Sequence, residues 1–137
     1  MGRILALDYG LKRTGVAVTD PAGIISTPLT AIDSSGLLEF LRNYFVKEQV
    51  DIIVVGMPRK LDNTPTHATR PVEKLVIKLK KTFPDKKVTL QDERFTTRIA
   101  KASMLESGMK KKDRRKKENV DKISATLILQ SFMESQK

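Results

Sequence analysis

Acidic residues follow apolar runs at two points in the sequence. Asp8 closes the run ILAL, and Asp92 and Glu93 come just after the run that ends at Leu90. Each of these acids fits an ordinary turn or loop, where acidic residues are common. Ligands, however, gather at the carboxyl ends of the central strands of α/β sheets. The same acids are therefore candidates for a binding site, and the residues by themselves leave both interpretations open.

Asp121 is harder to explain as a surface residue. It shares one helical stripe, at steps of three and four residues, with Ser124, Ala125, Ile128 and Phe132. The rest of this stripe has the composition of a face that packs inward, where an unsatisfied carboxylate is costly or becomes protonated. We therefore expect Asp121 to be paired, hydrogen-bonded or bound to a metal ion.

Acids from these three places would repel one another at a common edge, and a divalent cation would relieve that repulsion. Oxygen ligands in a chain without cysteine favour a hard ion, Mg²⁺ or Mn²⁺. Two such ions about 3.5–4 Å apart would align a water for attack on a phosphodiester and hold the leaving oxygen. The alternative is that the three acids are unrelated surface residues.

The charge of the chain points to a polyanionic partner. Its 137 residues include 26 Lys and Arg against 16 Asp and Glu, a formal charge of +10, which favours nucleic acid or an anionic membrane. Seven of the bases lie in one octet, Lys110–Lys117 (KKKDRRKK). Such a run is usually a solvated loop. Tethered between two folded segments, it would instead clamp phosphates without reading sequence, through Lys111, Lys112, Arg114 and Arg115.

The first part of the chain has the pattern of an antiparallel meander. The runs Arg3–Asp8 and Thr14–Thr19 should pair as a hairpin. Gly10 and Gly15 fit the positive φ of hairpin geometry better than the close approach of a ligand, which stays the alternative. A third run, Ile24–Ile32, follows the turn Asp20–Gly23.

The pattern then changes to alternating helices and strands. Asp33–Ser35 offers caps for a helix that runs to about Glu48, and Asp51–Val55 has the continuous apolar character of a strand buried on both faces. The later elements are a helix ending near Pro84, a strand over Lys87–Leu90, and helices over Thr96–Glu106 and Asn119–Ser135. This order predicts an α/β fold in a single domain over 1–137: a mixed five-stranded sheet, made of a three-stranded antiparallel meander and two parallel strands, with helices on both faces.

The composition excludes several classes of protein. With no cysteine and a single histidine, His67, the chain has no disulfides, no thiol chemistry and no multi-histidine zinc site. No uncharged stretch reaches the roughly 18 residues of a membrane span, and Asp8 interrupts the N-terminal apolar run before a signal-peptide core can form. We expect a cytoplasmic protein with nucleic acid, not a membrane, as its partner.

Four motifs together resemble those of a known family. They are DYGLKRTGVA over Asp8–Ala17, GMP over Gly56–Pro58, DERFTT over Asp92–Thr97, and DKISA over Asp121–Ala125 followed by ILQ over Ile128–Gln130. In this order and spacing they resemble the YqgF family of Holliday junction resolvases, described also as pre-16S rRNA nucleases. The resemblance extends over essentially the whole chain.

The resemblance implies an RNase H-like fold and a metal-dependent endonuclease that trims the precursor of ribosomal RNA. Asp8, Glu93 and Asp121 match the acidic triad of the family as catalytic residues and ligands of Mg²⁺ or Mn²⁺. Arg13 and Arg94 match its basic positions, which would contact the scissile phosphate or anchor loops. Lys12 and Arg13 are either phosphate contacts or plain hairpin charges. The chain departs from the family after Gly56–Pro58, where Asp62–Pro65 (DNTP) replaces an Asp-Gly or Asn-Gly turn.

Other functions stay open at this point. A resolvase acting on branched DNA would need two active sites, and the sequence does not distinguish a monomer from a homodimer. A binding module for nucleic acid or ribosomes would keep the basic octet without needing the acids. An actin-like phosphotransferase would also use a hairpin such as Asp8–Gly15, but the chain lacks its second domain and has no GxxxxGK[ST] loop.

Overall fold

The computed structural model describes residues 2–57, 69–92 and 117–136, the last range with side chains from residue 122 onward. Its five strands, in the sheet order β3-β2-β1-β4-β5, form one sheet. β1 is parallel to β4, which is parallel to β5, whereas β2 is antiparallel to both of its neighbours. The strands are β1 (Arg3–Tyr9), β2 (Arg13–Thr19), β3 (Ser26–Asp33), β4 (Val50–Met57) and β5 (Lys87–Asp92). The predicted mixed sheet, meander included, is confirmed.

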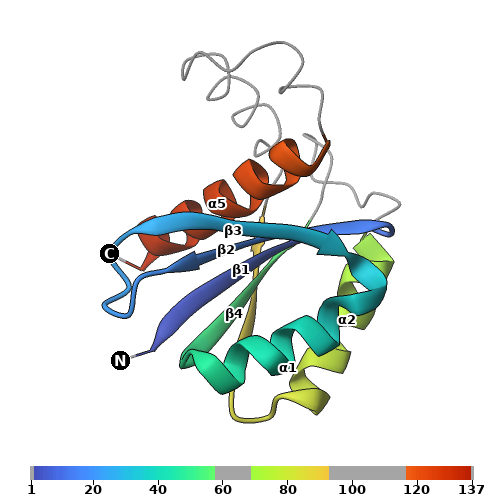
Figure 1. The fold of residues 1–137 in the computed structure, drawn as a ribbon, viewed down its shortest axis with the longest axis horizontal. Helices are drawn as coiled ribbons and strands as arrows, with labels where there is room; N and C mark the ends of the chain where they lie inside the picture. The colour runs from blue at the N-terminus through green and yellow to red at the C-terminus, as the bar shows by residue number, and fades with distance from the viewer. Residues whose placement is uncertain (1, 58–68, 93–116, 137) are drawn as a thin grey trace.

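Helices cover the sheet from both sides (Figure 1). A short 3₁₀ turn, η1 (Ser34–Gly36), leads into α1 (Leu37–Lys47), which lies with α2 (Thr69–Thr82) on one face. The long helix α5 (Lys117–Ser135) lies on the other face, against β1, β2 and β3. The predicted helix over Thr96–Glu106 falls outside the described residues. Within the described ranges, no helix is long and apolar enough to cross a bilayer.

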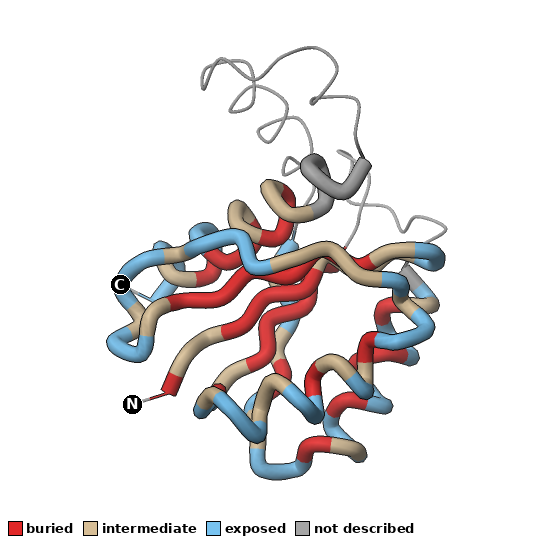
Figure 2. The backbone as a smooth tube through the Cα atoms, viewed as in Figure 1, coloured by how far each residue is buried: buried red, intermediate tan, exposed pale blue. Residues whose placement is uncertain are grey.

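The core has two layers, one on each side of the sheet, and β1 contributes to both. Leu5 and Leu7 are fully buried in the larger layer, beneath α1 and α2. Ala6, between them, is fully buried in the smaller layer, against α5. Because side chains of a strand alternate between faces, a strand buried on both sides reads as a continuous apolar run. Figure 2 shows this burial along the middle of the sheet.

The turn between β2 and β3 is held by one carboxylate. Asp20 Oδ1 accepts hydrogen bonds from the backbone N–H groups of Ile24 and Ile25, both at 2.8 Å. These bonds stabilise the charged form and lower the pKa of Asp20. Gly23, with φ of 72°, supplies the left-handed residue that this turn needs. The turn predicted over Asp20–Gly23 is confirmed.

Two local predictions were wrong. Gly10 and Gly15 were expected to supply positive φ, but Gly23 alone does so among the glycines of the described ranges. Gly10 instead allows a close approach, since a Cβ there would lie 2.6 Å from the carbonyl oxygen of Arg13. The caps expected at Asp33–Ser35 are also missing: neither Asp33, before η1, nor Gly36, before α1, makes a side-chain cap hydrogen bond.

The short distance between Gly10 and the carbonyl oxygen of Arg13 predicts that adding a methyl group at Gly10 lowers stability. Gly10→Ala should lower the free energy of unfolding by about 1–3 kcal/mol, because the new Cβ meets a backbone oxygen that cannot move freely. Gly36→Ala is the matched control, because a Cβ there meets nothing within 4 Å, and the change should be neutral or slightly stabilising. Urea denaturation of both variants measures the difference. Equal stability of the two variants would contradict the assignment.

Candidate active site

Asp8 lies near the carboxyl end of the central strand, on the face covered by α5. It follows Ala6 by two residues on β1, and Ala6 packs against Ala125, Ile128 and Leu129 of that helix. Since alternate residues of a strand share a face, the Asp8 side chain projects on the same side of the sheet. Asp8 is half-buried. The edge of the sheet where β1, β4 and β5 end therefore carries a carboxylate on its α5 side.

Glycines flank Asp8 on both neighbouring strands. Gly15 of β2 is its direct partner across the antiparallel pair. Gly56 of β4 follows Val55, the partner of Leu7, and so stands beside Asp8 on the other side. Both glycines are buried. The carboxylate therefore has no side chain next to it on either strand, which leaves room for a ligand at this point of the sheet.

This environment of Asp8 was not anticipated from the sequence. Gly15 was expected to serve hairpin geometry, and Gly56 was noted as the end of a buried run and as part of the GMP motif, but neither was placed beside Asp8. The signal that could have found them is the register of the hairpin. Once β1 and β2 are paired around a tight turn at Gly10, Gly15 falls opposite Asp8.

The helix that carries Asp121 runs back over the sheet in the direction opposite to β1 (Figure 1). Ser124, Ala125, Ile128 and Phe132 are buried, so the four described members of the predicted stripe do pack inward. Asp121 lies one helical turn before Ala125, and its side chain is outside the described part of the structure. Moving from Ala125 back to Asp121 along the helix, and from Ala6 on to Asp8 along the strand, leads to the same end of the sheet.

Asp92 lies within β5, whereas Glu93, the next residue, is outside the described part of the structure. Asp92 is the last residue of the strand and pairs with Met57 of β4. It is an even number of positions from Val88, which packs under α2, so the two side chains lie on the same face of the sheet. Gln91 lies on the opposite side, where its Nε2 donates to Ser131 Oγ of α5 at 2.9 Å. Asp92 therefore projects on the side of the sheet opposite to Asp8. It belongs to β5 itself, whereas the strand was predicted to end at Leu90.

Two basic residues lie at the same end of the sheet as Asp8. Lys12 is exposed in the turn between β1 and β2, and Arg13 is the half-buried first residue of β2. The turn is closed by Gly10 N–H donating to the carbonyl oxygen of Arg13 at 3.0 Å. This hairpin places two positively charged residues at the same edge of the sheet as Asp8.

Ser34 ties this hairpin to the start of η1. Its hydroxyl donates to the carbonyl oxygen of Gly10 and lies 2.8 Å from Thr14 Oγ1, and its backbone N–H donates to the carbonyl oxygen of Lys12 at 2.9 Å. Thr14 is fully buried. The residue expected to cap a helix therefore fixes the turn that carries Lys12 and Arg13.

The remaining predicted site residues lie outside the described ranges. They are Glu93, Arg94, the octet residues Lys111, Lys112, Arg114 and Arg115, and the unusual loop segment Asp62–Pro65. Within the described residues, no three acidic or histidine side chains come together in a group that could hold a metal ion. The structure therefore brings Asp8, Lys12 and Arg13 to one edge and leaves the complete triad a prediction.

This arrangement defines the class of protein. A mixed five-stranded sheet with an acid near the end of its central strand, and a helix across that face, is that of an RNase H-like α/β nuclease. A family model described as "RuvX: Holliday junction resolvase" matches residues 2–135, and the chain belongs to this family. The resemblance drawn from the motifs and the prediction of a nuclease are confirmed.

Relatives cover the full length of the chain. A protein of Phocaeicola vulgatus is 50% identical over all 137 residues and 99% of its own length. A protein of Amoebophilus asiaticus is 49% identical over the whole chain and 97% of its own length. One of Bacteroides fragilis is 47% identical over the whole chain and 99% of its own length. All three are named "Putative pre-16S rRNA nuclease".

The role of Ser34 can be tested by removing its hydroxyl. Ser34→Ala should lower the free energy of unfolding by about 1–3 kcal/mol, because the buried Thr14 hydroxyl and the Gly10 carbonyl lose a partner. Ser35→Ala, at the exposed neighbouring position, is the control and should change stability by less than about 0.5 kcal/mol. Thermal denaturation of both variants measures the difference in stability. An unchanged melting temperature for Ser34→Ala would show that the hydrogen bonds of the Ser34 hydroxyl do not stabilise the hairpin.

Proposed function

We propose that this chain is a Mg²⁺- or Mn²⁺-dependent endonuclease that trims the 5′ end of pre-16S rRNA during ribosome biogenesis, in the cytoplasm. Asp8, Glu93 and Asp121 act as its catalytic residues and metal ligands. The observation that supports this most is the common direction of two elements. β1 carries Asp8, and α5 carries Asp121, toward the same end of the same face of the sheet.

The spacing along the two elements agrees with a shared site. Ala6 and Ala125 belong to one packed cluster. Asp8 is two strand residues beyond Ala6, or about 6–7 Å, and Asp121 is about one helical turn beyond Ala125, or about 5–6 Å. Because the elements run in opposite directions, these displacements are parallel. Glu93 directly follows Asp92, where β5 ends at the same edge.

The residues of the site fit a hard divalent ion. Asp8 offers carboxylate oxygens on a half-buried edge, with glycines in place of side chains on both neighbouring strands. A chain without cysteine and with one histidine favours Mg²⁺ or Mn²⁺ over softer metals. When bound, such ions supply positive charge to a phosphodiester and lower the pKa of an attacking water.

Charged residues of the chain itself would position the substrate. Lys12 and Arg13, held on a tied hairpin beside Asp8, would contact the phosphate groups that flank the cleaved bond. Arg94 matches a second basic position in the family motif. The octet residues Lys111, Lys112, Arg114 and Arg115 would add contacts to the backbone of the strand, which favour binding without sequence preference.

The family description favours a second candidate function, the resolution of branched DNA. Both activities would use the same acids, so they differ in substrate and in assembly. A resolvase acts on two strands of a junction and needs two active sites, and hence a homodimer, whereas one protomer suffices for trimming RNA. Cleavage of precursor 16S RNA, single-stranded RNA and a synthetic four-way junction in parallel, with the oligomeric state measured by sedimentation, separates the two.

Neutralising each proposed ligand should abolish cleavage without weakening RNA binding. Asp8→Asn, Glu93→Gln and Asp121→Asn each remove one negative charge from the metal site and leave the phosphate contacts in place, so RNA affinity should stay equal or rise. A loss of a hundredfold or more in cleavage rate is expected for each variant. Gel assays in Mg²⁺ measure cleavage, and fluorescence anisotropy measures affinity.

Asp85→Asn is the control for these variants, because Asp85 is an exposed acid in the turn before β5, at the opposite end of that strand. It should cut like the unmodified chain. Normal cleavage by any one of the three ligand variants would remove that residue from the site. RNA binding without metal-dependent cleavage of any substrate would favour the binding-module alternative.

Neutralising the octet should reduce the salt dependence of RNA binding. Changing Lys111, Lys112, Arg114 and Arg115 to alanine removes up to four phosphate contacts, so the slope of log affinity against log salt should flatten by up to about 2.8 for a single strand. Affinity should fall equally for unrelated sequences. The control is Lys80→Ala with Lys81→Ala on α2, which should leave the slope unchanged, and a slope unchanged in both variants would make the octet a solvated loop.

A further inference from the structure

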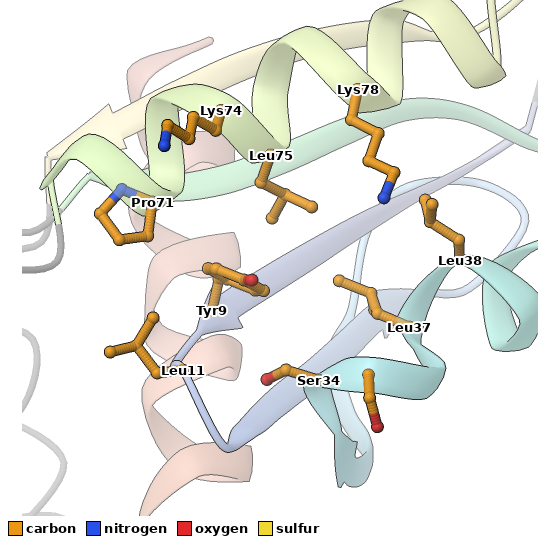
Figure 3. A pocket seen from close by; sticks show the side chains of 10 residues that line it. Tyr9, Leu11, Ser34, Leu37, Leu38, Pro71, Lys74, Leu75 and Lys78 are labelled. Atoms are coloured by element: carbon orange, nitrogen blue, oxygen red, sulfur yellow. The ribbon is translucent and has the colours of Figure 1, made fainter.

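A pocket lies on the side of the sheet opposite to Asp8. It has a volume of about 550 Å³, is open to solvent, and is lined by the end of β1, the η1–α1 junction and the first turns of α2. Tyr9, the residue after Asp8, stands between these walls (Figure 3). This volume falls in the usual range for small-molecule sites, roughly 300–1,000 Å³. Asp8, Lys12 and Arg13, the proposed site residues whose side chains the structure describes, are not among its lining residues.

The lining combines an apolar floor with a positively charged rim. Leu37 and Leu75 are buried core residues, and Tyr9 contributes a half-buried aromatic ring. Lys74 and Lys78 are exposed and stand one helical turn apart on α2. In Figure 3, Lys78 reaches from α2 toward Leu37 and Leu38 across the pocket. No acidic side chain is among the described residues that line it.

These groups select a ligand with an aromatic part and a negative charge. A ring stacked on Tyr9 would be covered by the leucines, and a phosphate would be bound by two ammonium groups that act as point charges. A fatty acid would satisfy the leucines but would make no use of an aromatic platform. A free inorganic anion would use the lysines alone. A nucleotide uses both parts of the pocket.

We propose that this pocket binds one nucleotide, with its base against Tyr9 and its phosphate at Lys74 and Lys78. This inference rests on the proposed function for its preferred source, a nucleotide of the substrate strand. Asp8 and Tyr9 are consecutive on β1 and project to opposite faces of the sheet at its edge. A strand whose phosphodiester is cut at Asp8 passes over that edge and places a neighbouring nucleotide in the pocket.

The same chemistry would accept a free mononucleotide, so the experiment has two arms. Binding of a fluorescent single-stranded RNA is measured in EDTA, where the proposed nuclease does not cut, and AMP is titrated while amide NMR signals of the pocket residues are followed. The variants are Lys74→Ala with Lys78→Ala, Tyr9→Leu, and Tyr9→Phe, which keeps the ring. Lys80→Ala with Lys81→Ala is the charge-matched control, because these exposed lysines of α2 do not line the pocket.

For a strand nucleotide, the Lys74 and Lys78 double variant should flatten the salt slope of RNA binding by about 1.4, while the control should not. Tyr9→Leu should weaken RNA binding by about fivefold or more, and Tyr9→Phe should bind as the unmodified chain does. For a free nucleotide, RNA binding is unchanged and the AMP-dependent shifts disappear in the same variants. Either pattern supports the nucleotide pocket and identifies its source.

The proposal is overturned if the Lys74 and Lys78 variant matches the control in both arms. These lysines are exposed, so their replacement keeps the test valid even if Tyr9→Leu proves unstable in thermal denaturation. Failure of the proposed function is distinguishable, because it appears as cleavage that persists in EDTA or in Asp8→Asn, or as the absence of metal-dependent cleavage of any substrate, and none of these results involves the pocket. RNA binding and AMP binding are read out without any cleavage.

Discussion

The burial of β1 between two helical layers is the constraint on which the rest of the structure depends. Leu5 and Leu7 must face α1 and α2, and Ala6 must face α5, because the strand has no exposed side. A shift by one residue would exchange these faces and bury Asp8 under the wrong helices. The same alternation that satisfies the core therefore decides that Asp8 and Tyr9 leave the sheet on opposite sides.

The hairpin at the end of β1 fixes the position of the basic residues at this edge of the sheet. Gly10 lets the backbone turn closely onto Arg13, and Ser34 holds the turn through hydrogen bonds to Gly10 and Lys12. The tie reaches from β3 and η1, so the meander and the first helix are connected at the point where the basic residues lie. A positively charged loop beside a carboxylate would otherwise be free to move in solvent.

The sequence was sufficient for the features that repeat along an element. The runs of β1, β2 and β4 and the buried stripe of α5 follow from spacing alone, because core packing enforces a period of 2 or 3.6 residues. Features that depend on two elements meeting were not visible. The glycines beside Asp8 required the register of three strands, and the pocket around Tyr9 required α2 to pack beside η1 and α1.

The wrongly predicted caps at Asp33–Ser35 are a second case in which contacts between distant elements could not be predicted from the sequence. Serine is a strong capping residue when its hydroxyl has no better partner, but here the hairpin carbonyl of Gly10 takes the hydrogen bond of Ser34. A tertiary contact from residues more than twenty positions earlier in the chain replaced the local one. The local sequence indicates a polar segment at a turn. Which backbone group accepts the hydrogen bond of the Ser34 hydroxyl depends on how the sheet is assembled.

The two layers of the core differ in the size of their side chains, and this difference bears on the site. Where α5 crosses the middle of the sheet, the contacts include Ala6 and Ala17 on the strands and Ala125 on the helix. Small residues let a helix axis lie closer to a sheet than leucines do, and the α1 and α2 side is rich in leucine. Shared metal ligation requires carboxylates from strand and helix to come within a few ångströms of one ion. The alanines on this face would also serve the proposed metal site, because larger residues there would move α5, and Asp121 with it, away from the strand that carries Asp8.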